Sequence, residues 1–154
     1  MRYQSTLIAV TDMARSLSFY REVLEQEVLL DYGENVTLAC GVALQSLSGW
    51  KSFLGTEDVT LKGRAGELYF EEDDMDGFLQ KLEGLDISYV HGVQIQPWGQ
   101  RCVRFYDPDG HVIEVGENMV AVTKRFRDAG MTVAEIAGQM DIAEEYVQMY
   151  LSQI

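Results

Sequence analysis

The chain has 154 residues, of which 47% are hydrophobic and 24% are charged, with 14 glycines and only 2 prolines. This composition is typical of a folded protein and excludes collagen-like and low-complexity chains. Twelve Lys and Arg against 25 Asp and Glu give a net charge of −13, which repels phosphate backbones and anionic lipid headgroups. Nucleic acid and membrane surfaces are therefore not expected partners.

The cysteines and the apolar runs indicate the cellular setting. Cys40 and Cys102 lie in separate apolar runs, and we interpret both as small apolar residues, because two cysteines make no disulfide framework. The first residues lack the apolar core of a secretory signal, and no apolar run approaches the ~20 residues of a membrane-spanning helix. We expect a reduced, cytoplasmic protein without a membrane segment.

The first third of the chain predicts a strand, a helix and three strands. Residues 6–10 form an apolar run typical of a buried strand, and Asp12 is a suitable N-cap for the helix that follows. Three β-like runs separated by turn residues come next, at 27–31, 35–40 and 42–47. Residues 48–66 contain several glycines and no sustained period, so we expect a connecting segment there.

The same order of elements then returns. Residues 67–71 predict a strand, and Asp74 followed by Met75 repeats Asp12 followed by Met13 at the start of a second helical stripe. Further strands are predicted at 87–93, 100–106 and 112–115. The last two are joined by Asp-Pro-Asp-Gly at 107–110, a strong β-turn sequence. The repeat indicates an internal duplication of a βαβββ unit.

The remaining residues, 118–154, differ in kind. They predict three short helices, the second of which opens with a capping box from Thr132 to Glu135. Residues 132–147 resemble a helix-turn-helix, but the helix expected to enter a groove carries Glu144 and Glu145 and no Lys or Arg. We therefore favour a packing role for this tail over DNA binding.

Two stretches resemble the signature sequences of a known superfamily. They are residues 10–24, with Val-Thr-Asp and then Arg-Ser-Leu-Ser-Phe-Tyr-Arg-Glu-Val-Leu, and residues 104–115, Arg-Phe-Tyr-Asp-Pro-Asp-Gly-His-Val-Ile-Glu-Val. The superfamily is the vicinal oxygen chelate group, which includes glyoxalase I, bleomycin-resistance proteins, fosfomycin-resistance enzymes and extradiol dioxygenases. The whole chain is similar to an uncharacterised glyoxalase-family subgroup. The signal is specific for the fold and weak for function, because one fold hosts many chemistries.

The resemblance implies an α+β fold in which two βαβββ units form a cup-shaped mixed sheet. We expect a vicinal oxygen chelate domain at 1–117, with units at about 1–48 and 66–117, and a C-terminal three-helix extension at 118–154. We also expect a homodimer that binds a small organic ligand. Because side chains on a strand alternate between two faces, the expected cup-facing residues include Ser5, Gln45, Glu67, Tyr69, Cys102, Arg104, Tyr106 and Glu114.

The superfamily's metal positions are only partly matched. Metal-dependent members take ligands from the first, fourth, fifth and eighth strands, most often His or Gln, Glu, His and Glu. The matching residues are Ser5, Gln45, Glu67 and Glu114, and neither His91 nor His111 falls on one of them. Because zinc and iron sites depend on imidazole or thiolate, this set suits at best Mg²⁺ or Mn²⁺. We expect no firm cofactor, and Gln45, Glu67 and Glu114 are the candidate metal ligands.

Glu67 and Glu114 are also the candidate catalytic residues. Two like charges in an enclosed site raise one pKa, as a general acid and base pair requires. Alternatively, one of them pairs with Arg104 or Arg101 and stiffens the cup. The carboxylates would in addition attract a cationic ligand.

Trp98, between Pro97 and Gly99, is a candidate stacking surface for a planar ligand, with Arg101 or Arg104 clamping a carboxylate. Trp98 could equally close a dimer interface or a lid. Tyr69 and Tyr106 fit either cup walls or hydroxyl donors.

Three functions stay open at this stage. The first is a metal-independent binding or sequestering protein of the bleomycin-resistance type. The second is a divalent-metal-dependent lyase, isomerase or dioxygenase. The third is a regulatory module in which the tail meets a protein or DNA partner.

Overall fold

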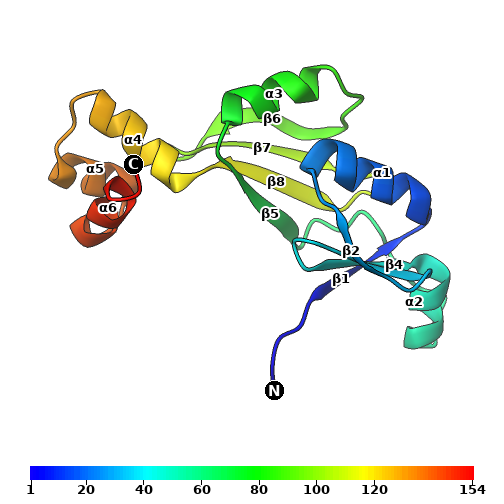
Figure 1. Cartoon of the computed structure of the whole chain (residues 1–154). Helices are drawn as coiled ribbons and strands as arrows, with labels where there is room; N and C mark the ends of the chain where they lie inside the picture. Colours follow the sequence, from blue (N-terminus) through cyan, green and yellow to red (C-terminus); the bar gives the residue numbers. More distant parts are fainter. The chain divides into compact units, whose positions relative to one another are not determined.

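The order strand, helix, strand, strand, strand occurs twice along the chain, followed by three helices (Figure 1). The structure is a computed structural model that describes all 154 residues. It contains two four-stranded sheets, which confirms the α+β class, and none of its helices is both long enough and apolar enough to span a bilayer. The chain forms two units, one from Met1–Gly66 with Tyr106–Val112 and the other from Glu67–Phe105 with Ile113–Ile154.

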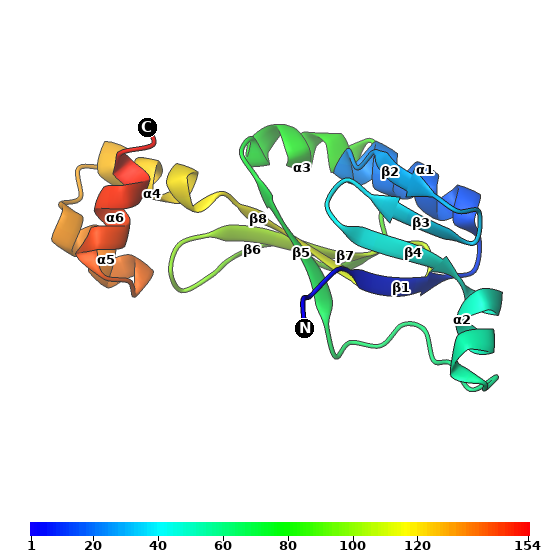
Figure 2. The ribbon, with the colours of Figure 1, turned by 60° about the horizontal axis from the view of Figure 1, so that its bottom comes forward.

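The first unit contains a mixed sheet in the order β1-β4-β3-β2, visible in Figure 2. β1 runs parallel to β4, whereas β3 is antiparallel to β4 and to β2. Ile8, Leu44 and Val36 lie side by side in register, and α1 contacts β4 and buries Tyr20 and Val23. The elements are β1 (Thr6–Val10), α1 (Met13–Leu24), β2 (Val28–Asp31), β3 (Asn35–Leu38), β4 (Val42–Ser46) and α2 (Leu47–Leu54).

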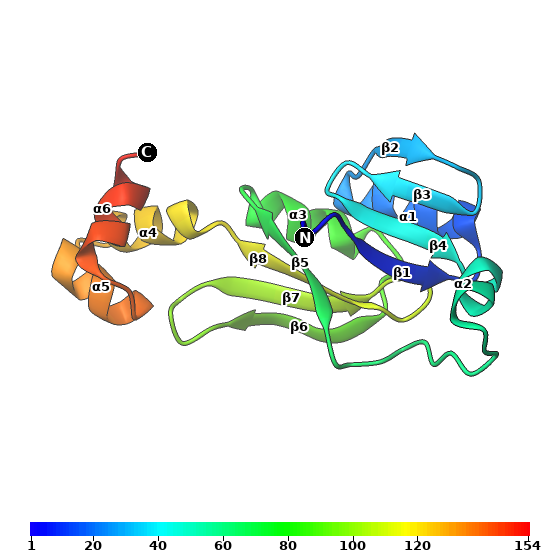
Figure 3. The ribbon, with the colours of Figure 1, turned by 90° about the horizontal axis from the view of Figure 1, so that it is seen from below.

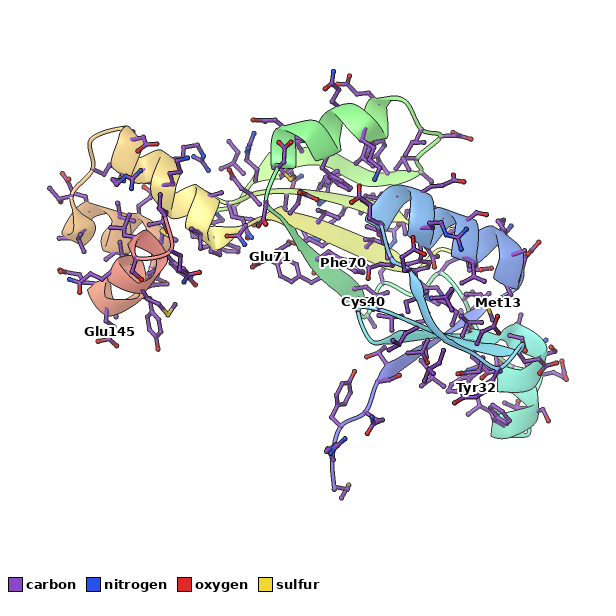
Figure 4. All side chains as sticks on the ribbon, in the orientation of Figure 1. Met13, Tyr32, Cys40, Phe70, Glu71 and Glu145 are labelled. Carbon is purple, nitrogen blue, oxygen red and sulfur yellow. The ribbon has the colours of Figure 1, made fainter.

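The helix α2 corrects the connecting segment expected at 48–66. The Ser46 hydroxyl caps this helix by accepting a hydrogen bond from the Gly49 amide at 3.1 Å, and Gly55 ends it in the left-handed conformation with φ 66°. At eight residues the helix is too short to show a sustained period. Cys40 is a second correction, because β3 ends at Leu38 and leaves the thiol exposed in the following turn (Figure 4).

The second unit contains a sheet in the order β5-β8-β7-β6 (Figure 3). Helix α3 packs on one face of it, where the rings of Phe78 and Phe105 lie 6.4 Å apart. Its elements are β5 (Glu67–Glu72), α3 (Met75–Glu83), β6 (Tyr89–Ile95), β7 (Arg101–Tyr106) and β8 (Val112–Glu117).

Three C-terminal helices follow in the same unit, as the sequence predicts. They are α4 (Met119–Asp128), α5 (Val133–Met140) and α6 (Glu144–Leu151). The capping box between Thr132 and Glu135 is present at the start of α5. The three helices share a small apolar core of their own, made of Val122, Ile136, Ala137, Met140 and Val147.

The two signature stretches bind each other within the first unit. Asp107, buried in the turn between β7 and β8, accepts a hydrogen bond from the Tyr20 hydroxyl of α1 at 3.1 Å and one from the His111 amide at 2.8 Å. Asp109, also buried, accepts from Thr11, Arg15 and Ser16. Burial raises the pKa of both Tyr20 and Asp107. These residues of the two signature stretches therefore connect the β7–β8 turn to helix α1.

We predict that Tyr20→Phe lowers the free energy of unfolding by about 1–2 kcal/mol, because Asp107 loses a partner and stays buried. Denaturant unfolding monitored by circular dichroism measures the change. Tyr32→Phe is the matched control, since Tyr32 is exposed (Figure 4) and should change stability by less than about 0.5 kcal/mol. Equal effects of the two substitutions would contradict the structural role of this turn.

Candidate functional site

Alternation along the strands gives the second sheet one apolar and one polar face. Val103, Phe105 and Ile113 are buried, and Phe105 meets α3 as described above. On β5, Leu68 and Phe70 are half-buried while their neighbours are exposed. We use the name polar face for Glu67, Tyr69, Glu71, Cys102, Arg104 and Glu114. Arg104 contacts Glu67, Cys102 and Glu114, and Tyr69 contacts Glu71.

The guanidinium of Arg104 lies between the two candidate catalytic carboxylates. Its Nε donates to Glu67 Oε2 at 2.8 Å and its Nη2 donates to Glu67 Oε1 at 3.3 Å. The same Nη2 donates to Glu114 Oε2. The Glu114 side chain is only 7% exposed, against 25% for Arg104 and 35% for Glu67. A single fixed positive charge on β7 is therefore shared by a buried carboxylate of β8 and a partly exposed carboxylate of β5.

His91 adjoins this arginine from β6. Its Nε2 lies 3.4 Å from Arg104 Nη1, and its Nδ1 lies 2.7 Å from the carbonyl oxygen of Gly92. Both contacts are satisfied when Nδ1 carries the proton, donates to Gly92 and leaves Nε2 to accept from Arg104. The sequence places His91 at none of the superfamily's metal positions and so does not single it out. The β6–β7 pairing shifts register on both sides of His91, which simple alternation does not anticipate.

A chain of hydrogen bonds joins Trp98 to the polar face. Trp98 Nε1 donates to Gln100 Oε1 at 3.0 Å, and Gln100 Nε2 donates to the Tyr69 hydroxyl at 2.9 Å. That hydroxyl donates in turn to Glu71 Oε1 at 3.0 Å. Burial raises the pKa of Tyr69, so its proton is retained for this bond. Gln100 is buried and is a site residue that sequence reasoning missed, since a glutamine at a strand end carries no distinctive signal.

Arg101 is engaged away from the polar face. Its Nη1 donates to Asp76 of α3 at 2.6 Å and its Nη2 to Glu117 of β8 at 3.1 Å. Arg125 of α4 also donates to Glu117, at 2.9 Å. Burial alone would raise the pKa of Glu117, but the hydrogen bonds from Arg101 and Arg125 outweigh it and hold this pKa below its ordinary value. Glu117 is a second buried carboxylate that the sequence did not single out.

Three of the residues expected in the site belong to the first unit. Gln45 is buried, and its side-chain oxygen accepts from Asn35 at 2.9 Å. The Ser5 hydroxyl is buried and has no hydrogen-bond partner. Tyr106 has the guanidinium of Arg64 5.9 Å from its ring centroid. The expected set thus divides between the two units. The second unit contains Arg101, which is engaged elsewhere, and a cluster of Glu67, Tyr69, Trp98, Arg104 and Glu114.

The donors in this cluster do not fit a divalent cation. Both Glu67 oxygens and Glu114 Oε2 accept hydrogen bonds from a guanidinium, so these oxygens are not free to coordinate a metal ion directly. The Gln45 oxygen is already an acceptor for Asn35. The structure contains no group of three or more His, Cys, Asp and Glu side chains that could hold a metal ion.

Comparison with known proteins identifies the family. Residues 3–120 match the family model of the glyoxalase-like domain. The chain belongs to the glyoxalase-like family. Its membership of the vicinal oxygen chelate superfamily, expected from the two signature stretches, is thereby confirmed.

Several solved structures are similar to this chain. A protein of unknown function from Agrobacterium tumefaciens is 37% identical, with a TM-score of 0.70 over 77% of this chain and 94% of that one. A lactoylglutathione lyase from the same organism is 26% identical, with a TM-score of 0.57 over 76% of this chain and 93% of that one. A glyoxalase-related enzyme from Fulvimarina pelagi, 20% identical with a TM-score of 0.64 over 76% of this chain and 89% of that one, shares the fold.

We predict that Glu117→Gln lowers the free energy of unfolding at neutral pH by about 2–3 kcal/mol, because two arginines lose their buried anionic partner. The lowered pKa of Glu117 means that its contribution is present above the ordinary value of 4.5 and is lost as the pH falls through the folded-state value. The difference between the two proteins should therefore shrink on acidification. Asp107 has a raised pKa, so its own contribution to the free energy of unfolding becomes more favourable as the pH falls.

Denaturant unfolding of both proteins between pH 7 and pH 3 measures this effect. Glu22→Gln is the matched control, because Glu22 is exposed on α1 and its substitution removes one negative charge at a distant position. A constant difference across the whole pH range would contradict the assignment to Glu117.

Proposed function

We propose that this glyoxalase-like protein binds a small organic cation at the polar face of its second sheet and does so without a resident metal ion. The observation that carries the proposal is the position of Arg104 between Glu67 and Glu114. An internal guanidinium there already neutralises part of the carboxylate charge that a metal ion would neutralise in a metal-dependent relative.

The electrostatics of the polar face favour a cation over an anion. Glu67, Glu71 and Glu114 supply three carboxylates against the one guanidinium of Arg104. Arg101, the other candidate clamp for an anionic ligand, is engaged by Asp76 and Glu117. The net charge of −13 also steers cations toward the protein as a whole.

Aromatic side chains add a planar component to this recognition. Tyr69 is 49% exposed and Trp98 is 37% exposed, and the buried Gln100 is hydrogen-bonded to both side chains. An aromatic ring beside a negatively charged surface attracts a cation with ~0.5–2 kcal/mol, depending on how far water is excluded. The ligand class that fits best is a planar or aromatic organic cation.

A metal-dependent lyase, isomerase or dioxygenase is the second candidate, favoured by the similarity to a lactoylglutathione lyase. In that case Glu67 and Glu114 would be the acid and base or the metal ligands. Both carboxylates would first have to release Arg104.

The cellular setting and the assembly state belong to the same proposal. The acidic composition agrees with a cytoplasmic protein that has no nucleic-acid partner. The exposed apolar residues Leu29 and Leu30 of the edge strand β2 agree with a homodimer. Sedimentation equilibrium at several concentrations tests the dimer, and a mass that stays at 17.4 kDa would contradict it.

We predict that benzamidinium binds more tightly than its neutral isostere benzamide, and at least about tenfold more tightly than the anionic benzoate. The three probes share one shape, so their differences report the charge preference of the polar face, and tenfold corresponds to ~1.4 kcal/mol. Isothermal titration calorimetry or ligand-observed NMR measures the affinities at fixed ionic strength.

The control is a pair of charge-matched variants. Glu67→Gln should weaken benzamidinium binding several-fold because it removes a carboxylate at the polar face, whereas Glu22→Gln, exposed on α1, should leave it unchanged. Equal binding of benzoate and benzamidinium, or equal effects of the two variants, would sink the proposal.

A further inference from the structure

The turn that carries Trp98 is contacted by the C-terminal helices. We use the name Trp98 loop for residues 96–99, which connect β6 to β7 within the second unit. Two backbone hydrogen bonds close it, from Gln96 to Gln100 and from Gly99 to Gln96, each 2.8 Å. These bonds shape the loop locally but do not themselves tie it to the rest of the unit.

Helices α4 and α5 supply that attachment. Arg125 Nη2 of α4 donates to the Gly99 carbonyl oxygen at 2.7 Å, and Gln139 of α5 donates to the Pro97 carbonyl oxygen at 2.9 Å. The Phe126 ring packs so closely on Gly99 that a Cβ added there would lie 2.2 Å from Phe126 Cζ. Gly99 also has φ +88°, so both its conformation and its packing require glycine.

The other side of the same loop meets the polar face. Trp98 is bonded through Gln100 to Tyr69, as described above. The side-chain Nε2 of Gln96 donates to Cys102 Sγ at 2.9 Å, and that sulfur lies 3.6 Å from Arg104 Nη1. A continuous set of contacts therefore runs from the C-terminal helices through the loop to Arg104.

The helices are a firm support for the loop. They share an apolar core, and Arg125, besides holding Gly99, is paired with the buried Glu117 at the end of β8. Figure 1 shows α4 following directly on β8, with α5 and α6 folded beside it. The loop thus lies between an independently packed group of helices and the sheet of the same unit.

We propose that α4 and α5 position the Trp98 loop and thereby set the affinity of the polar face for its ligand, with Phe126, Arg125 and Gln139 as positioning residues. The part that concerns affinity rests on the proposed function. The part that concerns the loop does not, because it is a statement about how Trp98 is held. The C-terminal extension is then part of the ligand-binding apparatus.

The test uses Trp98 as its own reporter. The chain has two tryptophans, so a Trp50→Phe background leaves Trp98 as the single indole fluorophore. Gln139→Ala and Phe126→Leu are introduced separately into the full chain. Met149→Ala is the matched control, since Met149 is exposed on α6 and is not part of the described contacts with the loop. Thermal unfolding monitored by circular dichroism checks that each variant is folded.

We expect acrylamide quenching of Trp98 to rise about twofold in Gln139→Ala and Phe126→Leu, and to stay unchanged in Met149→Ala. Losing one hydrogen bond worth ~1 kcal/mol increases the population of a displaced loop about fivefold, which is enough to account for a twofold rise in quenching. Gln139 is exposed, so its replacement loosens the loop without disturbing the helical core. Benzamidinium affinity should fall several-fold in the same two variants.

The outcomes separate the two proposals. Quenching that is the same in all three variants overturns the positioning of the loop, whatever the ligand does. Increased quenching with unchanged benzamidinium affinity overturns the link between the loop and the polar face. Increased quenching with no benzamidinium binding in the unaltered protein overturns the proposed function and still supports the positioning role.

Discussion

The placement of one arginine between two carboxylates is the interaction on which the proposed ligand binding depends. Removing Glu114 from water is costly unless a positive charge accompanies it, and Arg104 on the adjacent strand provides that charge from within the protein. A divalent ion would supply a similar charge from outside. In this chain the compensating charge is the guanidinium of Arg104.

The signature residues have a different task from the site residues. Asp107 and Asp109 are buried and engaged by Tyr20 and by the residues that begin α1, so they stabilise the fold of the first unit. This explains why the two stretches identify the family while leaving the activity open. Of the site residues, Gln100 and Trp98 lie outside both stretches, whereas Arg104 and Glu114 lie in the second one but face away from the turn that Asp107 and Asp109 stabilise.

The sequence predicted the strands and most helices because their periods are strong, and alternation correctly separated Val103 and Phe105 from Arg104. It missed α2, since eight residues are too few for a period and the cap at Ser46 resembles any turn serine. It also missed His91, Gln100 and Glu117. The first depends on register shifts in β6, and the other two acquire their roles only through partners distant in sequence, Tyr69 and Arg125. The pairing of Arg104 appeared as one alternative among several, because spacing alone does not tell which cation a carboxylate meets.

The most direct test of the central claim is a titration with Mn²⁺, followed by electron paramagnetic resonance of the free ion. The unaltered protein should show no site at the polar face with a Kd below about 1 mM. Arg104→Met, which removes the guanidinium and keeps an apolar stem, should bind Mn²⁺ at least about tenfold more tightly because Glu67 and Glu114 are then free to act as ligands. Stoichiometric micromolar binding by the unaltered protein, abolished in Glu114→Gln, would contradict the account.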